Sequence, residues 1–310
     1  MTEIIDEAKK LVEDKLINLT LEQKKDVLLR ASHDNSLPHV LWLLDNGIDI
    51  NTQDKEGWTA LLLAVKMGYV LIAGYLISQG ADLDYTLKGR SALMMAVAEK
   101  NLEIVKLIVK KYECRSTIGV GIVINQCDYN GASLPILLIA SNVDNQNGSS
   151  TTETDEELEI LDFLISHGVR VGATDKNGFT ALMWAAASNK LKTARILIKN
   201  GAKVNNIKIP GYNSPLPVVF PNPSKMTALM GAALNGHLEM CKLLIENGAN
   251  ARAKNKDGKM AIMLAGDNQH WEVVKYLEKL SGIQVKYYRF NEDLSDQEKE
   301  KLSEMINTKK

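Results

Sequence analysis

The sequence repeats itself with a period of roughly 33 residues, and this repetition restricts the possible folds more than any other feature. Five segments align in one frame: GWTALLLAVKMGYVLIAGYLISQGADLD from Gly57, GRSALMMAVAEKNLEIVKLIVKK from Gly89, GFTALMWAAASNKLKTARILIKNGAKVN from Gly178, MTALMGAALNGHLEMCKLLIENGANAR from Met226 and GKMAIMLAGDNQHWEVVKYLEKL from Gly258. A fixed period of this length is typical of arrays in which each unit contacts only its neighbours.

Each repeat has the pattern of a helical hairpin. The stretch TALMGAALNGHLEMCKLLIENG, from Thr227, gives about two turns of apolar residues at helical spacing, an Asn-Gly break, and a second amphipathic helix that ends at Gly248. One such hairpin cannot bury its own apolar face, so neighbouring hairpins must stack. The turns between repeats, such as Asp54-Lys55-Glu56-Gly57, should project as fingers along one edge.

These segments resemble the ankyrin repeat, whose signature is TPLHxA. The resemblance extends through NGHLEMCKLLIENGAN, from Asn235, and it implies an all-α solenoid of stacked helical hairpins with β-turn or hairpin fingers. Where the family has proline and histidine in its signature, this chain has alanine and mostly methionine, and we expect the row of Met94, Met183, Met230 and Met263 to pack inside the array.

We predict seven units between an N-terminal capping helix (1–20) and a C-terminal extension (281–310) with a short strand and a helix. The array covers 21–280, with units near 21–53, 54–86, 87–120, 121–174, 175–206, 224–254 and 255–280, and with insertions at 112–121, 142–155 and 207–223. The third insertion, IKIPGYNSPLPVVFPNP, holds five of the seven prolines and predicts a stiffened, enlarged finger.

Composition and charge exclude several classes of function. The chain is 45% hydrophobic and 24% charged, as a folded protein is, and its net charge of -1 gives no general attraction to phosphate, so we expect no nucleic-acid partner. The N-terminus lacks the pattern of a signal peptide, and three scattered cysteines predict free thiols in a reducing, cytoplasmic setting. The apolar run from Ala60 to Ile77 is interpreted as two buried helices, and we expect no membrane span.

No pattern in the sequence supports catalysis. The equivalent His237 and His270 should lie one interhelix spacing apart, about 8–10 Å, which disfavours a shared zinc ion. No phosphate-binding GxxxxGK[ST] motif occurs, and the acidic pair Glu156-Glu157 should stay ionised in a polar loop. We therefore expect no catalytic residue, no cofactor and no metal.

The resemblance implies a monomeric scaffold that binds a protein partner through the groove made by the fingers and the first helices. It places these residues on the exposed groove: Lys55, Glu56, Trp58, Lys66, Met67, Lys88, Arg90, Glu99, Lys176, Asn177, Phe179, Ser188, Leu234, Asn235, Lys259, Asp267 and Asn268. We expect the proline-rich finger to add Tyr212, Leu216, Val218 and Phe220.

Three alternatives stay open at this stage. Trp58 and Phe179 could pack on neighbouring fingers rather than contact a partner. The proline-rich finger could fold back on its own array. The whole chain could be an effector exported into a host cell, or an enzyme subunit whose activity lies in the inserted loops or in a partner.

Overall fold

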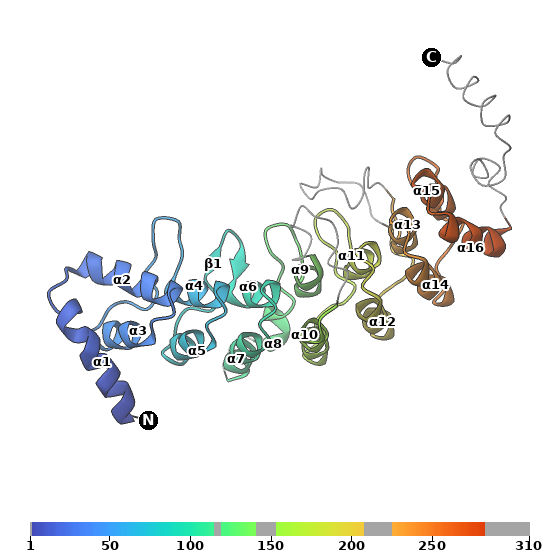
Figure 1. Cartoon of the computed structure of the whole chain (residues 1–310). Coiled ribbons are helices and arrows are strands. Elements are labelled where there is room, and N and C mark those ends of the chain that lie inside the picture. The colour runs from blue at the N-terminus through green and yellow to red at the C-terminus, as the bar shows by residue number, and fades with distance from the viewer. Residues whose placement is uncertain (1, 115–118, 141–152, 208–224, 283–310) are drawn as a thin grey trace, which may run out of the picture. The chain divides into compact units, whose positions relative to one another are not determined.

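The structure is a computed structural model of the chain, and it describes residues 2–114, 119–140, 153–207 and 225–282. These residues divide into two compact units, Met1–Lys176 and Asn177–Lys310, which are described separately below. Within each unit the predicted helical hairpins are present and stack side by side (Figure 1).

Unit 1 contains ten helices and one two-stranded sheet in its described part. In chain order these are α1 (Thr2–Leu16), α2 (Leu21–His33), α3 (Leu37–Asp45), α4 (Ala60–Lys66), α5 (Val70–Ser78), β1 (Thr86–Leu87), β2 (Arg90–Ser91), α6 (Ala92–Ala98), α7 (Leu102–Glu113), α8 (Val120–Val123), α9 (Leu134–Ala140) and α10 (Asp155–Ser166).

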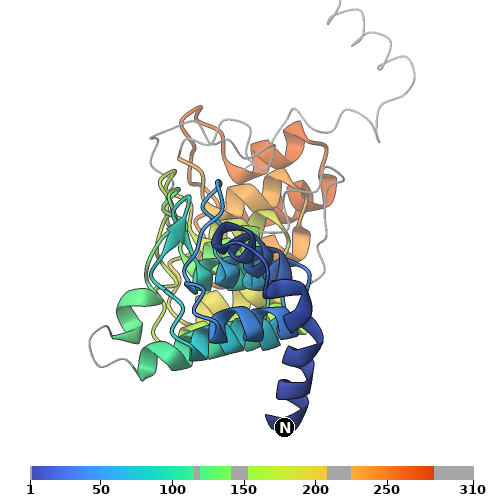
Figure 2. The same cartoon turned by 90° about the vertical axis from the view of Figure 1, so that its left-hand side faces the viewer.

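The helices of unit 1 form two layers. The first helices of the repeats, α2, α4, α6 and α9, pack on one another in that order, and the second helices, α3, α5, α7 and α10, do the same. Helix α1 packs against α3 at the N-terminal end of the unit, where Figure 2 draws it in dark blue. Helix α7 runs through Glu113 and α8 begins at Val120, so helical structure extends into the predicted first insertion.

Unit 2 repeats this two-layer arrangement with six described helices. They are α11 (Ala181–Ala187), α12 (Leu191–Lys199), α13 (Ala228–Leu234), α14 (Leu238–Glu246), α15 (Ala261–Asp267) and α16 (Trp271–Ser281). The first helices α11, α13 and α15 pack in series, and the second helices α12, α14 and α16 form the other layer. The proline-rich finger from residue 208 and the C-terminal extension from residue 283 lie outside the described residues.

Most first helices have only seven residues, which is too short for a stable isolated helix in water. Their stability therefore comes from packing, and the side chains of α11 are all buried. Caps add to it, because a Ser or Thr hydroxyl accepts a hydrogen bond from the third backbone N–H of the helix that follows, at 3.2–3.3 Å. The residues that cap in this way are Thr59, Ser91, Thr154, Thr180 and Thr227.

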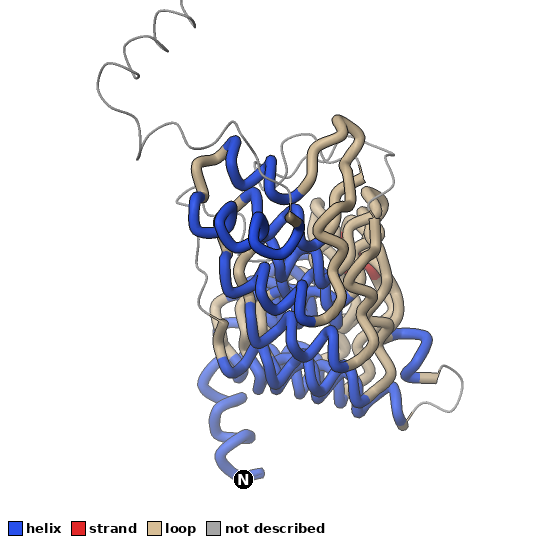
Figure 3. Tube along the Cα trace, turned by 90° about the vertical axis from the view of Figure 1, so that its right-hand side faces the viewer, coloured by secondary structure: helices blue, strands red, loops and turns tan. Residues whose placement is uncertain are grey.

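Asparagine side chains tie consecutive repeats together. The Oδ1 atom of Asn51 accepts a hydrogen bond from the backbone N–H of Asp82 at 2.9 Å. Asn205 does the same for Asn250 at 2.8 Å, and its Nδ2 also donates to the Gly248 carbonyl. These contacts fix the spacing between repeats and hold the fingers, which Figure 3 draws in tan, in register.

The methionines at the signature position are mainly core residues, as expected. Met94, Met183 and Met230 are buried and Met263 is half-buried. Flexible thioethers are suited to filling irregular gaps in such a core.

Candidate functional site

Unit 1 carries a cleft of about 700 Å³ where its fingers meet the first helices α4 and α6. Its walls combine aromatic, apolar and charged side chains from three consecutive repeats. The lining residues are Trp58, Lys66, Leu87, Lys88, Arg90, Met95, Ala98, Glu99 and Tyr129.

The first wall of the cleft is the finger that carries Trp58. The Oδ1 atom of Asp54 accepts hydrogen bonds from the backbone N–H groups of Glu56 and Trp58, both at 2.8 Å. The finger is closed by a bond from the Asp54 N–H to the Trp58 carbonyl, and Gly57 takes the positive φ of 89° that the turn requires. This local network holds the half-buried indole at the mouth of the cleft.

The second wall is a tight β-hairpin, in which Thr86 pairs with Ser91 and Leu87 with Arg90. The two residues of its turn, Lys88 and Gly89, both have positive φ, 51° and 74°, as a type I′ turn requires. The turn places the Lys88 side chain on the cleft wall beside Arg90. Lysine is uncommon in this left-handed conformation, where asparagine and glycine are preferred.

The third wall is the next finger, which presents Tyr129 with 55% of its surface exposed. The Asp128 side chain accepts hydrogen bonds from the N–H groups of Asn130 and Ala132, at 2.8 and 2.9 Å, and so repeats the geometry of Asp54. Gly89 lies directly against this finger, since a Cβ at Gly89 would come within 2.8 Å of the Tyr129 Cβ. The hairpin and the third finger therefore support each other.

A buried carboxylate orients Arg90. The Nε atom of Arg90 lies 3.6 Å from Oδ2 of Asp128, whose side chain is 1% exposed. Neither of these two atoms has a hydrogen-bond partner in the part of the chain that the structure describes, so their attraction is electrostatic. The Nε edge of the guanidinium thus faces Asp128, while 42% of the Arg90 side chain stays exposed.

An ion pair between repeats closes the helix side of the cleft. Lys66 is the last residue of α4 and pairs with Glu99, which caps the C-terminal end of α6. Both side chains are partly exposed, so the pair sets the shape and charge of this wall more than the stability of the unit.

Five of the predicted groove residues come together in this cleft, namely Trp58, Lys66, Lys88, Arg90 and Glu99. Lys55, Glu56, Met67 and Lys176 are exposed elsewhere on unit 1.

Sequence reasoning missed Leu87, Met95, Ala98 and Tyr129. Alignment of CDYNG with QDKEG puts Tyr129 at the position of Lys55, and this signal could have identified it.

Several predicted groove residues of unit 2 are buried, and the expectation that they are exposed was wrong. Phe179 is only 2% exposed because its ring packs on Trp184 of α11, with ring centroids 5.6 Å apart. Trp58 occupies the equivalent position, but α4 has Leu63 where α11 has Trp184. Asn177 is also buried, at 9% exposure, and so is Leu234, at 8%, at the end of α13.

The other predicted residues of the fifth and sixth repeats have mixed positions. Ser188 and Asn235 are half-buried, and the Asn235 amide donates to the carbonyls of Ala187 and Gly231. Tyr212, Leu216, Val218 and Phe220 lie outside the described residues.

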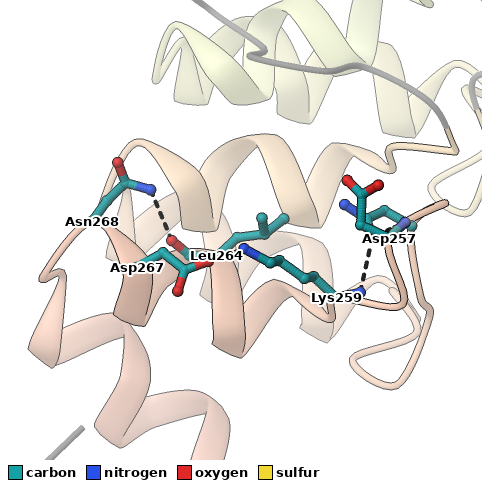
Figure 4. Close-up of polar contacts among 6 residues, drawn as sticks. Asp257, Lys259, Leu264, Asp267 and Asn268 are labelled. Atoms are coloured by element: carbon teal, nitrogen blue, oxygen red, sulfur yellow. Dashed lines mark hydrogen bonds and ion pairs between the residues drawn. The ribbon is translucent and has the colours of Figure 1, made fainter. Parts of the chain in front are cut away.

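The predicted residues of the last repeat are exposed, and each has a partner within the repeat. Lys259 Nζ lies 2.7 Å from Oδ2 of Asp267, and the Asn268 amide donates to the Leu264 carbonyl at 3.0 Å (Figure 4). The hydrogen bond to Asp267 raises the pKa of Lys259 above its ordinary value. The charges of Lys259 and Asp267 therefore neutralise each other within the repeat.

Polar groups elsewhere in the molecule have structural roles. His237 Nε2 bonds to the Ala187 carbonyl and His270 Nε2 to the Leu234 carbonyl, both at 3.0 Å, so each ring connects its repeat to the preceding one. Burial raises the pKa of the Cys241 thiol to about 12, while Cys114 and Cys127 are exposed free thiols. Among the described residues, no group of three or more His, Cys, Asp or Glu side chains is placed to hold a metal ion, and no helix is long and apolar enough to cross a membrane.

Comparison with known proteins places this architecture in a family. The profile described as "Ankyrin repeats (3 copies)" matches residues 28–118, 134–208 and 215–288, which is most of the chain. The chain therefore belongs to the ankyrin repeat family.

Relatives share part of this repeat region, and each of them extends beyond the matched segment. The chain is 30% identical over 200 residues to the palmitoyltransferase AKR1 of Lachancea kluyveri, and this match covers 63% of this chain and 25% of that protein. It is 24% identical over 217 residues to the putative ankyrin repeat protein L371 of Acanthamoeba polyphaga mimivirus, covering 63% of this chain and 27% of the relative. It is also 49% identical over 62 residues to human protein phosphatase 1 regulatory subunit 27, covering 19% of this chain and 40% of that protein. The chain thus spans less than half the length of each of these relatives.

Solved structures agree on the fold. The ankyrin repeat domain of human ASB11 matches 83% of this chain and 99% of its own, with a TM-score of 0.62 and 19% identity. The ankyrin repeat domain of Bcl-3 matches 80% of this chain and 97% of its own, with a TM-score of 0.59 and 20% identity.

Proposed function

We propose that this chain is a non-catalytic scaffold that holds a partner protein in the cleft of unit 1. The observation that carries the proposal is the convergence of Trp58, Arg90 and Tyr129 on one cleft, which is supported by a stack of buried helices. Aromatic and arginine side chains dominate the binding energy of protein interfaces. Ankyrin repeat proteins, the family to which the chain belongs, serve mainly in protein binding.

The rigidity of the cleft supports the same proposal. Backbone and side-chain hydrogen bonds fix each finger, so little conformational entropy is lost when a partner binds. The relatives differ in their named activities, and the palmitoyltransferase has three quarters of its length outside the match. The shared repeat region is therefore better suited to positioning a partner than to chemistry.

A paired capture experiment tests the proposal. Immobilised full chain should retain a specific protein from the native cell, identified by mass spectrometry, and the purified partner should bind with a measurable Kd. Replacing Trp58 and Arg90 together by alanine should weaken this binding by about 30-fold or more, because both side chains line the cleft and are of the types that dominate interface energies. A Lys259→Ala variant is the matched control, since Lys259 lies in the other unit and pairs with Asp267.

Two outcomes would contradict the proposal. One is full binding by a cleft variant whose circular dichroism shows an intact helical array. The other is a reproducible catalytic turnover by the purified chain that survives both substitutions.

A further inference from the structure

The cleft of unit 1 is lined by more positive than negative charge. Three of its lining side chains are cationic, Lys66, Lys88 and Arg90, and one is anionic, Glu99. Glu99 is engaged by Lys66, and Lys88 has no ion-pair partner among the described residues. Asp128 offsets part of the Arg90 charge from beneath, so Lys88 leaves the site with a net positive charge.

The orientation of Arg90 leaves its outer edge available to a ligand. Asp128 faces the Nε atom, so the two terminal nitrogens of the guanidinium are directed away from the closest approach of that carboxylate. Two parallel N–H donors are the geometry that binds a carboxylate in bidentate fashion. Because Asp128 is buried, it restrains Arg90 without competing for the exposed face.

An apolar surface lies beside these cations. Trp58 and Tyr129 present aromatic rings from the flanking fingers, and Leu87 and Met95 supply aliphatic surface between them. Aromatic rings gain additional energy from edge-to-face contacts with another ring, and methionine adapts its shape to a ligand. The cleft therefore offers an apolar subsite next to an anion subsite.

We propose that this cleft recognises an acidic segment of a partner protein in which a carboxylate side chain adjoins an aromatic one. The proposal rests on the scaffold function proposed above and names the chemistry of the partner. Arg90 and Lys88 bind the carboxylates, and the aromatic ring lies between Trp58 and Tyr129. A nucleic acid would also bring negative charge, but the chain as a whole has a net charge of -1 and lacks the basic excess of nucleic-acid binders.

Defined peptides test the chemistry on the full chain. The probe is a fluorescein-labelled peptide of sequence GSEEFEELGS, measured by fluorescence anisotropy. Its comparison peptides are GSKKFKKLGS, which reverses the charge, and GSEEGEELGS, which removes the ring. We expect the first peptide to bind about 30-fold more tightly than the basic peptide and about 10-fold more tightly than the one without a ring.

Charge reversal in the cleft should remove this binding. The double variant Lys88→Glu, Arg90→Glu should lose about 30-fold or more in affinity for GSEEFEELGS. The matched control Lys259→Glu should stay within about twofold, because Lys259 does not line the cleft. Equal losses in both variants, or equally tight binding of a short oligothymidylate, would overturn the proposal.

A displayed library of random peptides distinguishes a failure of the proposed acidic specificity from a failure of the proposed scaffold function. The library is selected on the full chain and depleted on the charge-reversed double variant. If no peptide is enriched, the cleft does not bind protein segments and both proposals fail. Enrichment of basic or uncharged peptides keeps the scaffold function and overturns the acidic specificity, whereas an acidic consensus with an aromatic residue supports both.

Discussion

The cleft of unit 1 and the last repeat of unit 2 use equivalent positions in opposite ways. Lys66 and Asp267 each form the last residue of a first helix. Lys66 pairs with Glu99 in the following repeat, whereas Asp267 pairs with Lys259 inside its own repeat. On the cleft wall Lys88 and the exposed part of Arg90 add positive charge beside the Lys66–Glu99 pair, whereas in the last repeat the predicted residues Lys259 and Asp267 neutralise each other.

The two regions also differ in what surrounds their fingers. The hairpin turn at Lys88 and Gly89 is packed against the Tyr129 finger, while no described residue lies within 4 Å of a Cβ built on Gly258. A finger that packs closely against the next finger, as the hairpin does against the Tyr129 finger, forms part of a wall. The position of a repeat within its unit therefore decides whether the same local sequence produces a binding surface.

The largest effect should come from alanine at the two finger glycines. Gly89→Ala should cost about 2 kcal/mol or more, because alanine resists the left-handed backbone and its Cβ would clash with the backbone of Tyr129. Gly258→Ala should cost only about 1 kcal/mol, since its φ of 76° is unfavourable but no described residue would contact the added Cβ. Urea titrations in which unfolding is monitored by hydrogen exchange of the α6 and α15 amides measure the two losses of stability separately.

Binding provides a second measurement on the same variants. Gly89→Ala should displace Tyr129 and weaken capture of the acidic peptide, whereas Gly258→Ala should leave binding unchanged. Equal losses of stability in the two variants would remove the distinction between a supported and an open finger.

The next effect concerns the hydroxyl groups that precede first helices. Thr227→Ala should destabilise unit 2 by about 1 kcal/mol, because it removes the cap on the Met230 N–H. Ser133→Ala should be neutral or slightly stabilising, since the buried Ser133 hydroxyl finds no hydrogen-bond partner within the described residues. Urea unfolding of the two variants checks this, and a loss at Ser133 as large as that at Thr227 would contradict it.

A smaller effect should depend on pH. It concerns a position that holds a titratable histidine in unit 2 and a non-titrating asparagine in unit 1. His237 and Asn101 both begin a second helix and both reach a carbonyl of the preceding repeat, Ala187 and Gly68 respectively. Burial, together with the nearby His270, lowers the pKa of His237 below its ordinary value. The neutral ring therefore contributes stability that is fully present above about pH 6.5 and is lost as the pH falls through the lowered pKa.

Substitution isolates this contribution from other titrating groups. Between pH 7.5 and pH 5.5 the wild-type chain should lose more stability in α14 than a His237→Asn variant does, and α7 should show no such difference between the two proteins. The loss stays below that of a cap, because the protonated ring still donates to Ala187. Equal pH dependence of the two proteins in α14 would show that His237 does not titrate with folding.

Much of the fold could be predicted because the same sequence pattern occurs in several repeats. The capping threonines, the finger glycines and the apolar faces recur at one spacing, so one clear unit such as Thr227 to Gly248 identifies the degenerate ones. The extension of α7 through Glu113 could not be read from the period. It depends on Tyr112, which is buried and whose hydroxyl donates to Asp84 of the preceding repeat.

The site was predictable in part for the same reason. Repeat alignment assigns residues to equivalent positions, and Trp58 and Arg90, which it assigned to the groove, line the cleft, but alignment does not show how a neighbouring side chain changes exposure. Phe179 shares its position with Trp58 but is buried, and the ring of Trp184 lies against it. In the last repeat Lys259 and Asp267 form an ion pair although they lie eight positions apart in the sequence. Alignment of the repeats does not predict this contact.

The smallest predicted effect tests the contrast between the two ion pairs directly. Glu99→Gln removes the one acidic side chain among the described residues that line the cleft and frees Lys66, so we expect affinity for the acidic peptide to rise about threefold. Asp267→Asn frees Lys259 in the same chemical sense but away from the cleft, and anisotropy should show no change. Each substitution removes one negative charge, so a general effect of net charge would raise both affinities equally and would contradict a local site. A rise that is confined to Glu99→Gln, and that shrinks as salt is added, is the result expected if Lys66 joins Lys88 and Arg90 in binding the peptide.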